Sequence, residues 1–241
     1  FVSALTVAGR VSWEVLPAAV AVVGVFLARE PLVVLWRGFG ETGAAWRSLA
    51  WYGPLVGVSG AVLLWRVSAI PLVALGLAAV GLLAVSTWLV VHNRRRSVLL
   101  QVSSAAGLNA SAVVAWLAVR PALEAPIGWL WALQFAHSTA AVLAVHARLE
   151  ARIAARGSLE LVEMRRRAVV AQALLLAAAV VVAGLGRWWM AGALGFSGMI
   201  HAGDLWRLRH SSFVATPLTR VGLRELAIST LYSALLVVGL R

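Results

Sequence analysis

Arginines cluster between long apolar segments throughout this chain, and this alternation limits the fold more than any other feature. A helix needs roughly 20 apolar residues to cross the hydrocarbon layer of a bilayer. Segments close to that length recur along all 241 residues. We predict about eight membrane-spanning helices, at Val11–Ala28, Ala50–Trp65, Ser68–Val91, Val98–Val119, Pro126–Ala147, Ala168–Gly186, Trp188–Gly203 and Gly222–Leu240.

The placement of the arginines predicts the orientation of these spans. If the gaps alternate between the two sides of the membrane, 16 of the 21 Arg fall on one side and five on the other. Cytoplasmic loops carry the excess of basic residues in membrane proteins. We therefore predict a multi-pass protein of the bacterial cytoplasmic (inner) membrane, with Arg-rich loops inside and the C-terminus outside. Most Trp residues lie near span ends, as in an aromatic belt.

The composition excludes several classes of protein. Hydrophobic residues make up 62% of the chain and charged residues 12%, whereas a soluble domain is about half apolar and one quarter charged. Cysteine is absent, which excludes disulfides, zinc–thiolate sites and thiol nucleophiles. The net charge of +12 comes from dispersed arginines, so we expect membrane lipids and not nucleic acid as partners. The fold class is an all-α polytopic transmembrane bundle, with residues 1–241 forming a single domain.

Some segments depart from a simple span. Ala50–Trp65 and Trp188–Gly203 are short, and their helix-breaking residues predict close packing or a break. These residues are Gly53, Pro54, Gly57, Gly192, Gly195 and Gly198. Arg148–Arg167 reads as a helix extension, a break at Gly157–Ser158 and an interfacial segment. Because the chain starts at Phe1 and not Met, we expect a preceding segment, with residues 1–9 as the tail of an earlier helix.

Polar side chains within two predicted spans form a candidate intramembrane cluster. Its members are Gln101, Ser104, Asn109, Gln134 and His137. In the first span, Ser97, Gln101, Ser104 and Ser111 recur at intervals of four, three and seven, which places them on one helical face. Two explanations stay open: hydrogen bonds between helices, or the lining of a cavity.

Charged residues at the predicted cytoplasmic ends form a candidate site for an anion or a lipid headgroup. They are Arg29, Glu30, Arg94, Arg95, Arg96, Arg148, Glu150, Arg152, Asp204, Arg224 and Glu225. We expect Arg224 and Glu225 to lie in the first turn of the last helix, where they would cap and pair. No residue is assigned a catalytic or metal-binding role, since phosphate-binding, serine-hydrolase and zinc-protease motifs are absent. No cofactor is predicted. The sequence is compatible with a bound lipid. The spacing of the histidines does not indicate a haem site.

Four stretches of the chain resemble the YwiC-like family of bacterial membrane proteins. They are Phe26–Arg37 (FLAREPLVVLWR), Arg94–Leu100 (RRRSVLL), His146–Gly157 (HARLEARIAARG) and Arg220–Leu226 (RVGLREL). That family typically opens with a Lys-Glu/Gln-His-Gly-Ala-Trp segment before its first helix, which this sequence lacks. The resemblance implies a ninth, N-terminal helix ahead of Phe1 and supplies a fold expectation with little function.

The helical plan also looks like that of the UbiA-type prenyltransferases. Those enzymes hold magnesium and a prenyl diphosphate with two Asp-rich motifs, because a hard dication prefers several carboxylate oxygens. Here the corresponding positions fall near Arg29–Glu30 and His146–Glu150, and Asp204 is the chain's single Asp. The resemblance therefore implies the helical arrangement without magnesium-dependent chemistry, and we lean against an enzyme.

Three functions remain open from the sequence. The first is a non-catalytic structural or accessory subunit of a larger membrane complex, indicated by the absence of catalytic motifs and by glycine-rich helices. The second is a UbiA-like protein that binds a lipid or isoprenoid, with its headgroup near Arg29, Arg94 and Arg148. The third is a small-solute transporter, for which Ala50–Trp65 and Trp188–Gly203 would be the broken helices.

Overall fold

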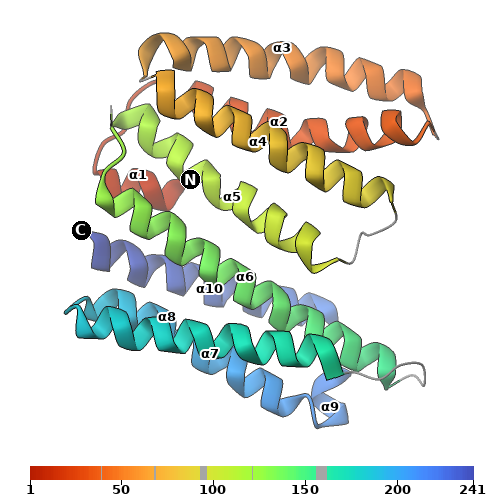
Figure 1. The fold of residues 1–241 in the computed structure, drawn as a ribbon, viewed down its shortest axis with the longest axis vertical. Helices are drawn as coiled ribbons and strands as arrows, with labels where there is room; N and C mark the ends of the chain where they lie inside the picture. Colours follow the sequence, from red (N-terminus) through yellow and green to blue (C-terminus); the bar gives the residue numbers. More distant parts are fainter. Residues whose placement is uncertain (39, 68, 93–96, 121, 156–161) are drawn as a thin grey trace. The chain divides into compact units, whose positions relative to one another are not determined.

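A computed structural model of the chain describes residues 1–38, 40–67, 69–92, 97–120, 122–155 and 162–241. These residues form helices and no strands, as predicted. The helices are α1 (Val2–Ala8), α2 (Val15–Arg37), α3 (Thr42–Arg66), α4 (Ala69–Val91), α5 (Val98–Val119), α6 (Ala125–Ala154), α7 (Val162–Gly184), α8 (Trp188–Arg207), α9 (Ser211–Val214) and α10 (Leu218–Leu240) (Figure 1). They fall into two compact units, unit 1 (Phe1–Trp131) and unit 2 (Ala132–Arg241).

Unit 1 brings the ends of its helices together as the alternation of arginines predicts. At one end, Arg120 donates to the carbonyl of Ala8 over 2.9 Å, and Arg66 lies 5.3 Å from the centre of the Trp13 ring. At the other end, Arg37 at the end of α2 donates to the carbonyl of Val90 near the end of α4. Consecutive helices α2 to α5 therefore run in alternating directions (Figure 1).

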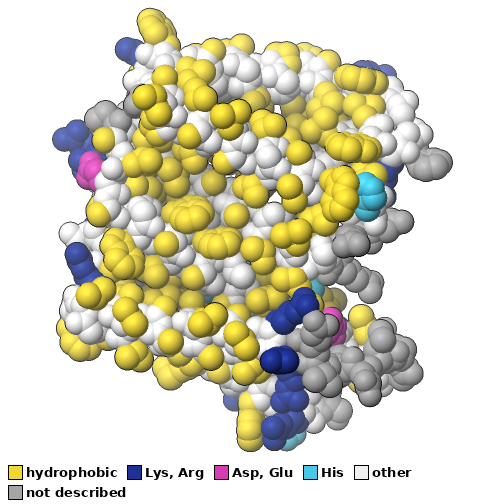
Figure 2. Space-filling model, viewed as in Figure 1, with side chains coloured by type: hydrophobic (Ala, Val, Ile, Leu, Met, Phe, Trp, Pro, Cys, Tyr) yellow, Lys and Arg dark blue, Asp and Glu magenta, His cyan; other side chains and the backbone are white. Residues whose placement is uncertain are grey.

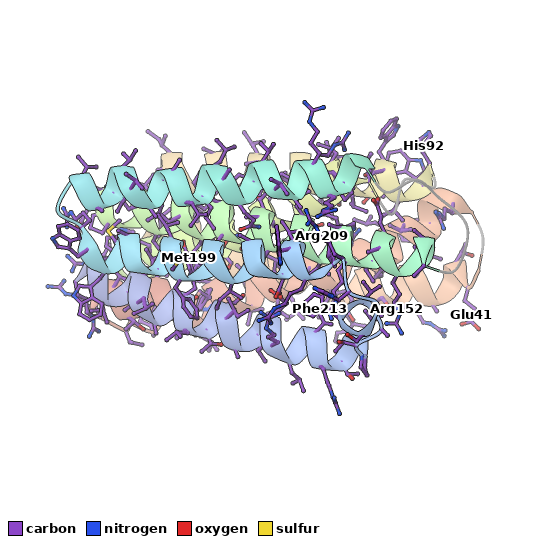
Figure 3. The ribbon with its side chains drawn as sticks, turned by 90° about the horizontal axis from the view of Figure 1, so that it is seen from below. Glu41, His92, Arg152, Met199, Arg209 and Phe213 are labelled. Atoms are coloured by element: carbon purple, nitrogen blue, oxygen red, sulfur yellow. The ribbon has the colours of Figure 1, made fainter. Side chains whose placement is uncertain are left out.

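Unit 2 shows the same alternation. Gly239, near the end of α10, lies against Met190 and Trp189 at the start of α8. At the opposite end, Arg224 of α10 pairs with Asp204 of α8. The side chains of Arg152 and Phe213 also lie at this end, whereas Met199 lies nearer the middle of α8 (Figure 3). Each unit thus has two ends, and the arginines gather at them.

Six of the helices are long and apolar enough to cross a membrane: α2, α3, α4, α5, α10 and residues Met164–Gly184 of α7. Hydrophobic side chains cover much of the face seen in Figure 2, and the arginines lie towards the helix ends. This supports a multi-pass membrane protein. The 30-residue α6 and the 20-residue α8 fall outside this set. The count of eight spans is not confirmed and stays a prediction for these two helices.

Several helices are longer than the predicted spans. α2 continues from Ala28 through Pro31 to Arg37 and ends at Gly38, whose positive φ of 65° is accessible to glycine at little cost. α3 starts at Thr42, eight residues before the predicted Ala50. Apolar length measures the membrane-embedded part of a helix, and the polar turns that extend it contain good helix formers such as Ala and Arg.

The start of the last helix differs from the prediction in a way that affects the candidate site. α10 begins at Leu218 and not at Gly222. Arg224 and Glu225 therefore lie beyond its first turn, and the prediction that they cap the helix is wrong. The extension of α6 past Ala147 is confirmed as far as Ala154. The predicted break at Gly157–Ser158 lies outside the described residues.

The glycine-rich spans are continuous helices, so the predicted break is not found at Gly53–Gly57 or in α8. Close packing is confirmed at one of these positions. A Cβ atom built on Gly198 would lie 2.8 Å from Cδ2 of Leu176 in α7, whereas a Cβ on Gly195 would meet no atom within 4 Å. Glycine at 198 thus sets how closely α7 and α8 approach.

This difference predicts the effect of one substitution. Gly198→Val is expected to destabilise the protein by about 1–3 kcal/mol, because the added methyl groups overlap Leu176 in a packed interface. Gly195→Val is the matched control on the same helix, since it adds the same side chain in open space. Thermal melting of the two purified variants in detergent measures the difference. Equal melting temperatures would show that α7 and α8 can separate without cost.

Candidate functional site

Unit 1 contains a cavity of about 580 Å³ between α2, α3, α4 and α5. Most of its wall is apolar, with side chains such as Val25, Phe26, Val56, Leu64, Leu72 and Leu82. Gly60 and Gly76 also line it, and a Cβ atom at either would meet no atom within 4 Å. At these two positions α3 and α4 present no side chain to the cavity, which leaves space between the helices.

The cavity is elongated along the helices. On α4 its lining extends from Leu72 to Ser86, a rise of about 21 Å in an α-helix. On α2 the lining runs from Ala21 to Arg29. Clusters of buried side chains lie on either side of that stretch of α2, one containing Ala18 and the other Val33. The shape suits a chain-like ligand.

Arg29 is the charged residue in the described wall of this cavity. It shares a face of α2 with Val22, Val25 and Phe26, because these residues are seven, four and three positions before it. Its side chain is 29% exposed, and its buried Nε atom has no hydrogen-bond partner within the part of the chain that the structure describes. Among the described residues it forms an ion pair with the exposed Glu30, at 4.0 Å. A cation with an unused donor thus lines an apolar cavity.

Four serines also line the cavity, and three of them have described hydrogen bonds. The hydroxyls of Ser86, Ser103 and Ser111 donate to carbonyls three residues earlier in their own helices, over 2.9, 3.0 and 2.6 Å. The fourth is Ser104. Because three of these hydroxyl protons are used within the helix, the serines add little polarity to the cavity.

Unit 2 contains a chain of hydrogen-bonded polar side chains from three helices. His137 of α6 bonds through Nδ1 to Ser197 Oγ (2.8 Å) and through Nε2 to Ser229 Oγ (3.2 Å). His201 Nε2 lies 2.8 Å from Oε2 of Glu225. The two histidines and Ser197 are at most 2% exposed. Ser197 and His201 are four residues apart on α8, as are Glu225 and Ser229 on α10, so each pair shares a helix face.

Charged residues surround Glu225, which lies at one end of this series of hydrogen-bonded side chains. Arg224 donates to Asp204, and Arg148 donates to the carbonyl of Phe213 over 2.6 Å. The guanidinium of Arg148 also lies 4.1 Å from the centre of the Phe213 ring. A small cavity of about 10 Å³, lined in part by Arg148, Asp204 and Glu225, has room for about one water molecule.

The other end of the chain is closed by Tyr232. Its ring stacks on His137 with 4.0 Å between centroids, and its hydroxyl donates to the carbonyl of Leu133 over 2.8 Å. Beside it, Gln134 donates to Ser233 over 3.0 Å. These bonds join α6 to α10, so in unit 2 the polar residues of the predicted cluster connect helices.

The residues proposed from the sequence are thus distributed over both units. Arg29 and Glu30 lie on α2 in unit 1, and Arg148, Asp204, Arg224 and Glu225 come together in unit 2. Glu150 and Arg152 lie on α6 in unit 2. Arg94, Arg95 and Arg96 lie outside the described residues. Of the intramembrane cluster, Gln101, Ser104 and Asn109 belong to α5 in unit 1, and Gln134 and His137 to the unit 2 part of α6.

Sequence reasoning missed the pairing of His201 with Glu225 and the roles of Ser197, Ser229 and Tyr232. The signal was present, because polar residues recur every three or four positions from Ser197 to Asp204 and from Glu225 to Ser233. It was missed because His137 and Glu225 were assigned to two different candidate sites. Within the described ranges, no group of three or more acidic or histidine side chains is arranged to hold a metal ion.

Comparison with known proteins identifies the N-terminal part of the chain. Residues 1–116 match the family described as YwiC-like protein. The match includes two of the four resembling stretches, Phe26–Arg37 and Arg94–Leu100, and the wall of the unit 1 cavity up to Val114. No curated protein and no solved structure matches the chain. The UbiA-like arrangement stays an expectation. Over residues 1–116, this chain carries a YwiC-like family domain.

Proposed function

We propose that unit 1 binds a single amphipathic lipid, either an isoprenoid or an acyl lipid, with its apolar chain in the cavity and an anionic headgroup at Arg29. The observation that carries this proposal is the apolar cavity of about 580 Å³ with Arg29 in its wall. Cavities that bind small molecules have volumes of about 300–1,000 Å³ and few polar groups. The volume and the lining both agree with a ligand that is mostly hydrocarbon.

The headgroup chemistry follows from the guanidinium of Arg29. Arginine binds carboxylates and phosphates through paired hydrogen bonds, and here the Nε donor is unused. Glu30 is 79% exposed and lies 4.0 Å away, so it competes weakly for the cation. A phosphate or carboxylate at the membrane surface would therefore gain a strong contact without the loss of an existing buried ion pair.

The proposal is for binding and not for prenyl transfer. Magnesium-dependent diphosphate chemistry needs several carboxylates around the metal. The carboxylate nearest the Arg29 guanidinium is exposed, and the single Asp of the chain lies in unit 2. A complex subunit and a small-solute transporter remain alternative proposals. The first predicts partner proteins in place of a bound lipid, and the second predicts transport of a solute.

Filling the cavity tests the proposal. We expect the protein purified from membranes to carry an anionic lipid that survives detergent exchange, and Gly76→Phe to lose it, because the ring occupies space that is open at Gly76. Arg29→Gln is expected to lower the retention of anionic lipid about 10-fold or more, since a hydrogen bond to a charged group contributes about 1.5–3 kcal/mol. Native mass spectrometry and lipid extraction measure both effects.

Gly81→Phe is the matched control. Gly81 is on the same helix, also has open space at its Cβ position, and does not line the described cavity. It should retain the lipid at the wild-type level. Equal lipid content in Gly76→Phe and Gly81→Phe would contradict the proposal. The headgroup found in the extract distinguishes an isoprenoid phosphate from an acyl lipid.

A further inference from the structure

The hydrogen bonds of His201 determine where its protons lie. Nδ1 is 3.0 Å from the main-chain carbonyl oxygen of Ser197 and 3.4 Å from the Ser197 hydroxyl. A carbonyl oxygen only accepts hydrogen bonds. Nδ1 of His201 therefore carries a hydrogen, and the ring has one nitrogen left, Nε2, to bond with the carboxyl group of Glu225.

A second proton must lie between His201 and Glu225. Nε2 of His201 is 2.8 Å from Oε2 of Glu225, a hydrogen-bond distance that requires one donor. The donor is either the imidazolium, facing a carboxylate, or the carboxylic acid, facing a neutral imidazole. Both forms have the same total charge and share one proton. Its removal would leave a lone pair of Nε2 against a carboxylate in a site where His201 is 1% exposed.

From this geometry we propose that the His201–Glu225 pair is a proton-binding site, and that Ser197 transfers its proton onward to His137. Buried chains of acidic and histidine side chains in membrane helices are a physical means of moving protons, because each member holds a proton that the next can accept. This inference concerns unit 2 and does not depend on lipid binding in unit 1.

The transfer step balances within the observed contacts. In the starting form His201 is an imidazolium, Glu225 a carboxylate and His137 neutral. His201 gives its Nδ1 proton to the Ser197 oxygen, and Ser197 gives its own hydroxyl proton to Nδ1 of His137, 2.8 Å away. Two N–H or O–H bonds break and two form. The positive charge moves from His201 to His137. Neutral His201 still donates from Nε2 to Glu225, and its Nδ1 now accepts from the Ser197 hydroxyl in place of donating to the Ser197 carbonyl.

Protons have access to the pair from one side. The side chain of Glu225 is 19% exposed and borders the small cavity, which has room for about one water molecule. The charged groups that face the pair are Arg148 from α6, Asp204 from α8 and Arg224 from α10. Together with Glu225 they provide two cations and two carboxylates, so the entrance is polar without a large net charge.

The path ends within the helices. From Ser197 to Asp204 the rise along α8 is about 10 Å, roughly one third of the hydrocarbon thickness. Beyond His137, Nε2 of His137 contacts the hydroxyl of Ser229 over 3.2 Å, and the hydroxyl of Tyr232 is committed to the carbonyl of Leu133. The described residues therefore provide proton access from the Arg-rich end of unit 2 as far as His137 and Ser229.

Infrared difference spectroscopy of the full-length protein in lipid nanodiscs tests the proposal. Difference spectra between high and low pH are expected to contain carboxyl and imidazole bands that shift on labelling with ¹³C-Glu and ¹⁵N-His. Glu225→Gln should remove the Glu225 band and alter the His201 bands. Ser197→Ala should leave the pair's bands and remove those of His137.

Glu30→Gln is the control, because it removes an exposed carboxylate in unit 1 and should leave the bands of Glu225 in place. Identical difference spectra for Glu225→Gln and Glu30→Gln would overturn the proposal, since the pair would then be a static ion pair. If the Gln variant does not fold, absence of ¹⁵N-sensitive imidazole bands in the wild type overturns it equally. Retained lipid in Glu225→Gln would keep this outcome separate from the function proposed for unit 1.

Discussion

A single cysteine in place of Ala155 is expected to react with a membrane-impermeant thiol reagent only from the cytoplasmic side, and one in place of Leu185 only from outside. This result requires α6 and α7 both to cross the membrane. If α6 does not cross, both positions change sides and the labelling pattern reverses. The effect is therefore close to all-or-none, and it decides whether α6 is a span.

The physical reason to expect a crossing lies in the polar contacts of α6 and α8. These two helices contain Gln134, His137 and His201, which lower their hydropathy. A polar side chain in a bilayer is costly when it is unpaired and much less so when a neighbouring helix satisfies it. Here Gln134 bonds to Ser233, His137 to Ser197 and His201 to Glu225. A hydropathy value counts these polar side chains as unfavourable and takes no account of their hydrogen-bond partners.

The chain is well suited to this measurement, because it has no native cysteine. Glu41→Cys is the cytoplasmic control and Leu123→Cys the outside control, since Glu41 lies between α2 and α3 and Leu123 follows α5, all of which are long and apolar enough to cross. Glu41 and His92 lie at the same end of unit 1 (Figure 3), so His92→Cys should behave as Glu41→Cys does. Labelling of Glu41→Cys and Leu123→Cys from the same side would contradict the predicted topology as a whole.

Trp116→Ala is expected to cost about 3–5 kcal/mol of stability, the usual range for a buried Trp. Trp116 is 2% exposed, and its indole nitrogen donates to the carbonyl of Ala122 over 2.9 Å. The truncation removes this bond and leaves a void in α5's packing. Bilayer lipid does not fill a buried void, so the lost van der Waals contacts are not replaced. The expected fall in melting temperature is about 6–20 °C.

Trp65→Ala is the matched control for this measurement. Trp65 is 82% exposed, and its ring lies 5.4 Å from the guanidinium of Arg66. Loss of that contact is expected to cost about 0.5–1 kcal/mol. Thermal melting of both variants in the same detergent, monitored by circular dichroism and not by tryptophan fluorescence, measures the difference. Equal destabilisation would show that Trp116 packs no more tightly than a residue at the membrane interface.

The sequence predicts the bounds of some helices more accurately than those of others. Val98–Val119 is predicted with the same bounds as α5, because Ser97 supplies an N-cap that accepts from the Leu100 amide at 3.2 Å and an apolar segment follows. The starts of α3 and α10 are placed too late. Apolar length marks where a helix is embedded in lipid, and it contains no information on how far the helix continues in water.

The cavity of unit 1 illustrates a second kind of limit. Arg29 is a candidate from the sequence, but the space beside it depends on Gly60 and Gly76 from two other helices facing the same way. The sequence analysis did not single out Gly60 and Gly76. It singled out Gly53 and Gly57 for close packing or a break, yet a Cβ atom at Gly53 or Gly57 meets no neighbouring atom. A glycine's role depends on the helix opposite it, and sequence spacing on one helix does not specify that helix.

From the amino-acid order alone follow an all-helical membrane protein, the alternation of its arginine-rich ends and most of its helices, because solvent preference and helix length are properties of short segments. The pairing of His201 with Glu225, the bond from Ser197 to His137 and the space beside Arg29 could not be read from that order. Each joins residues from different helices, and their distances are set by how those helices rotate and approach one another during packing.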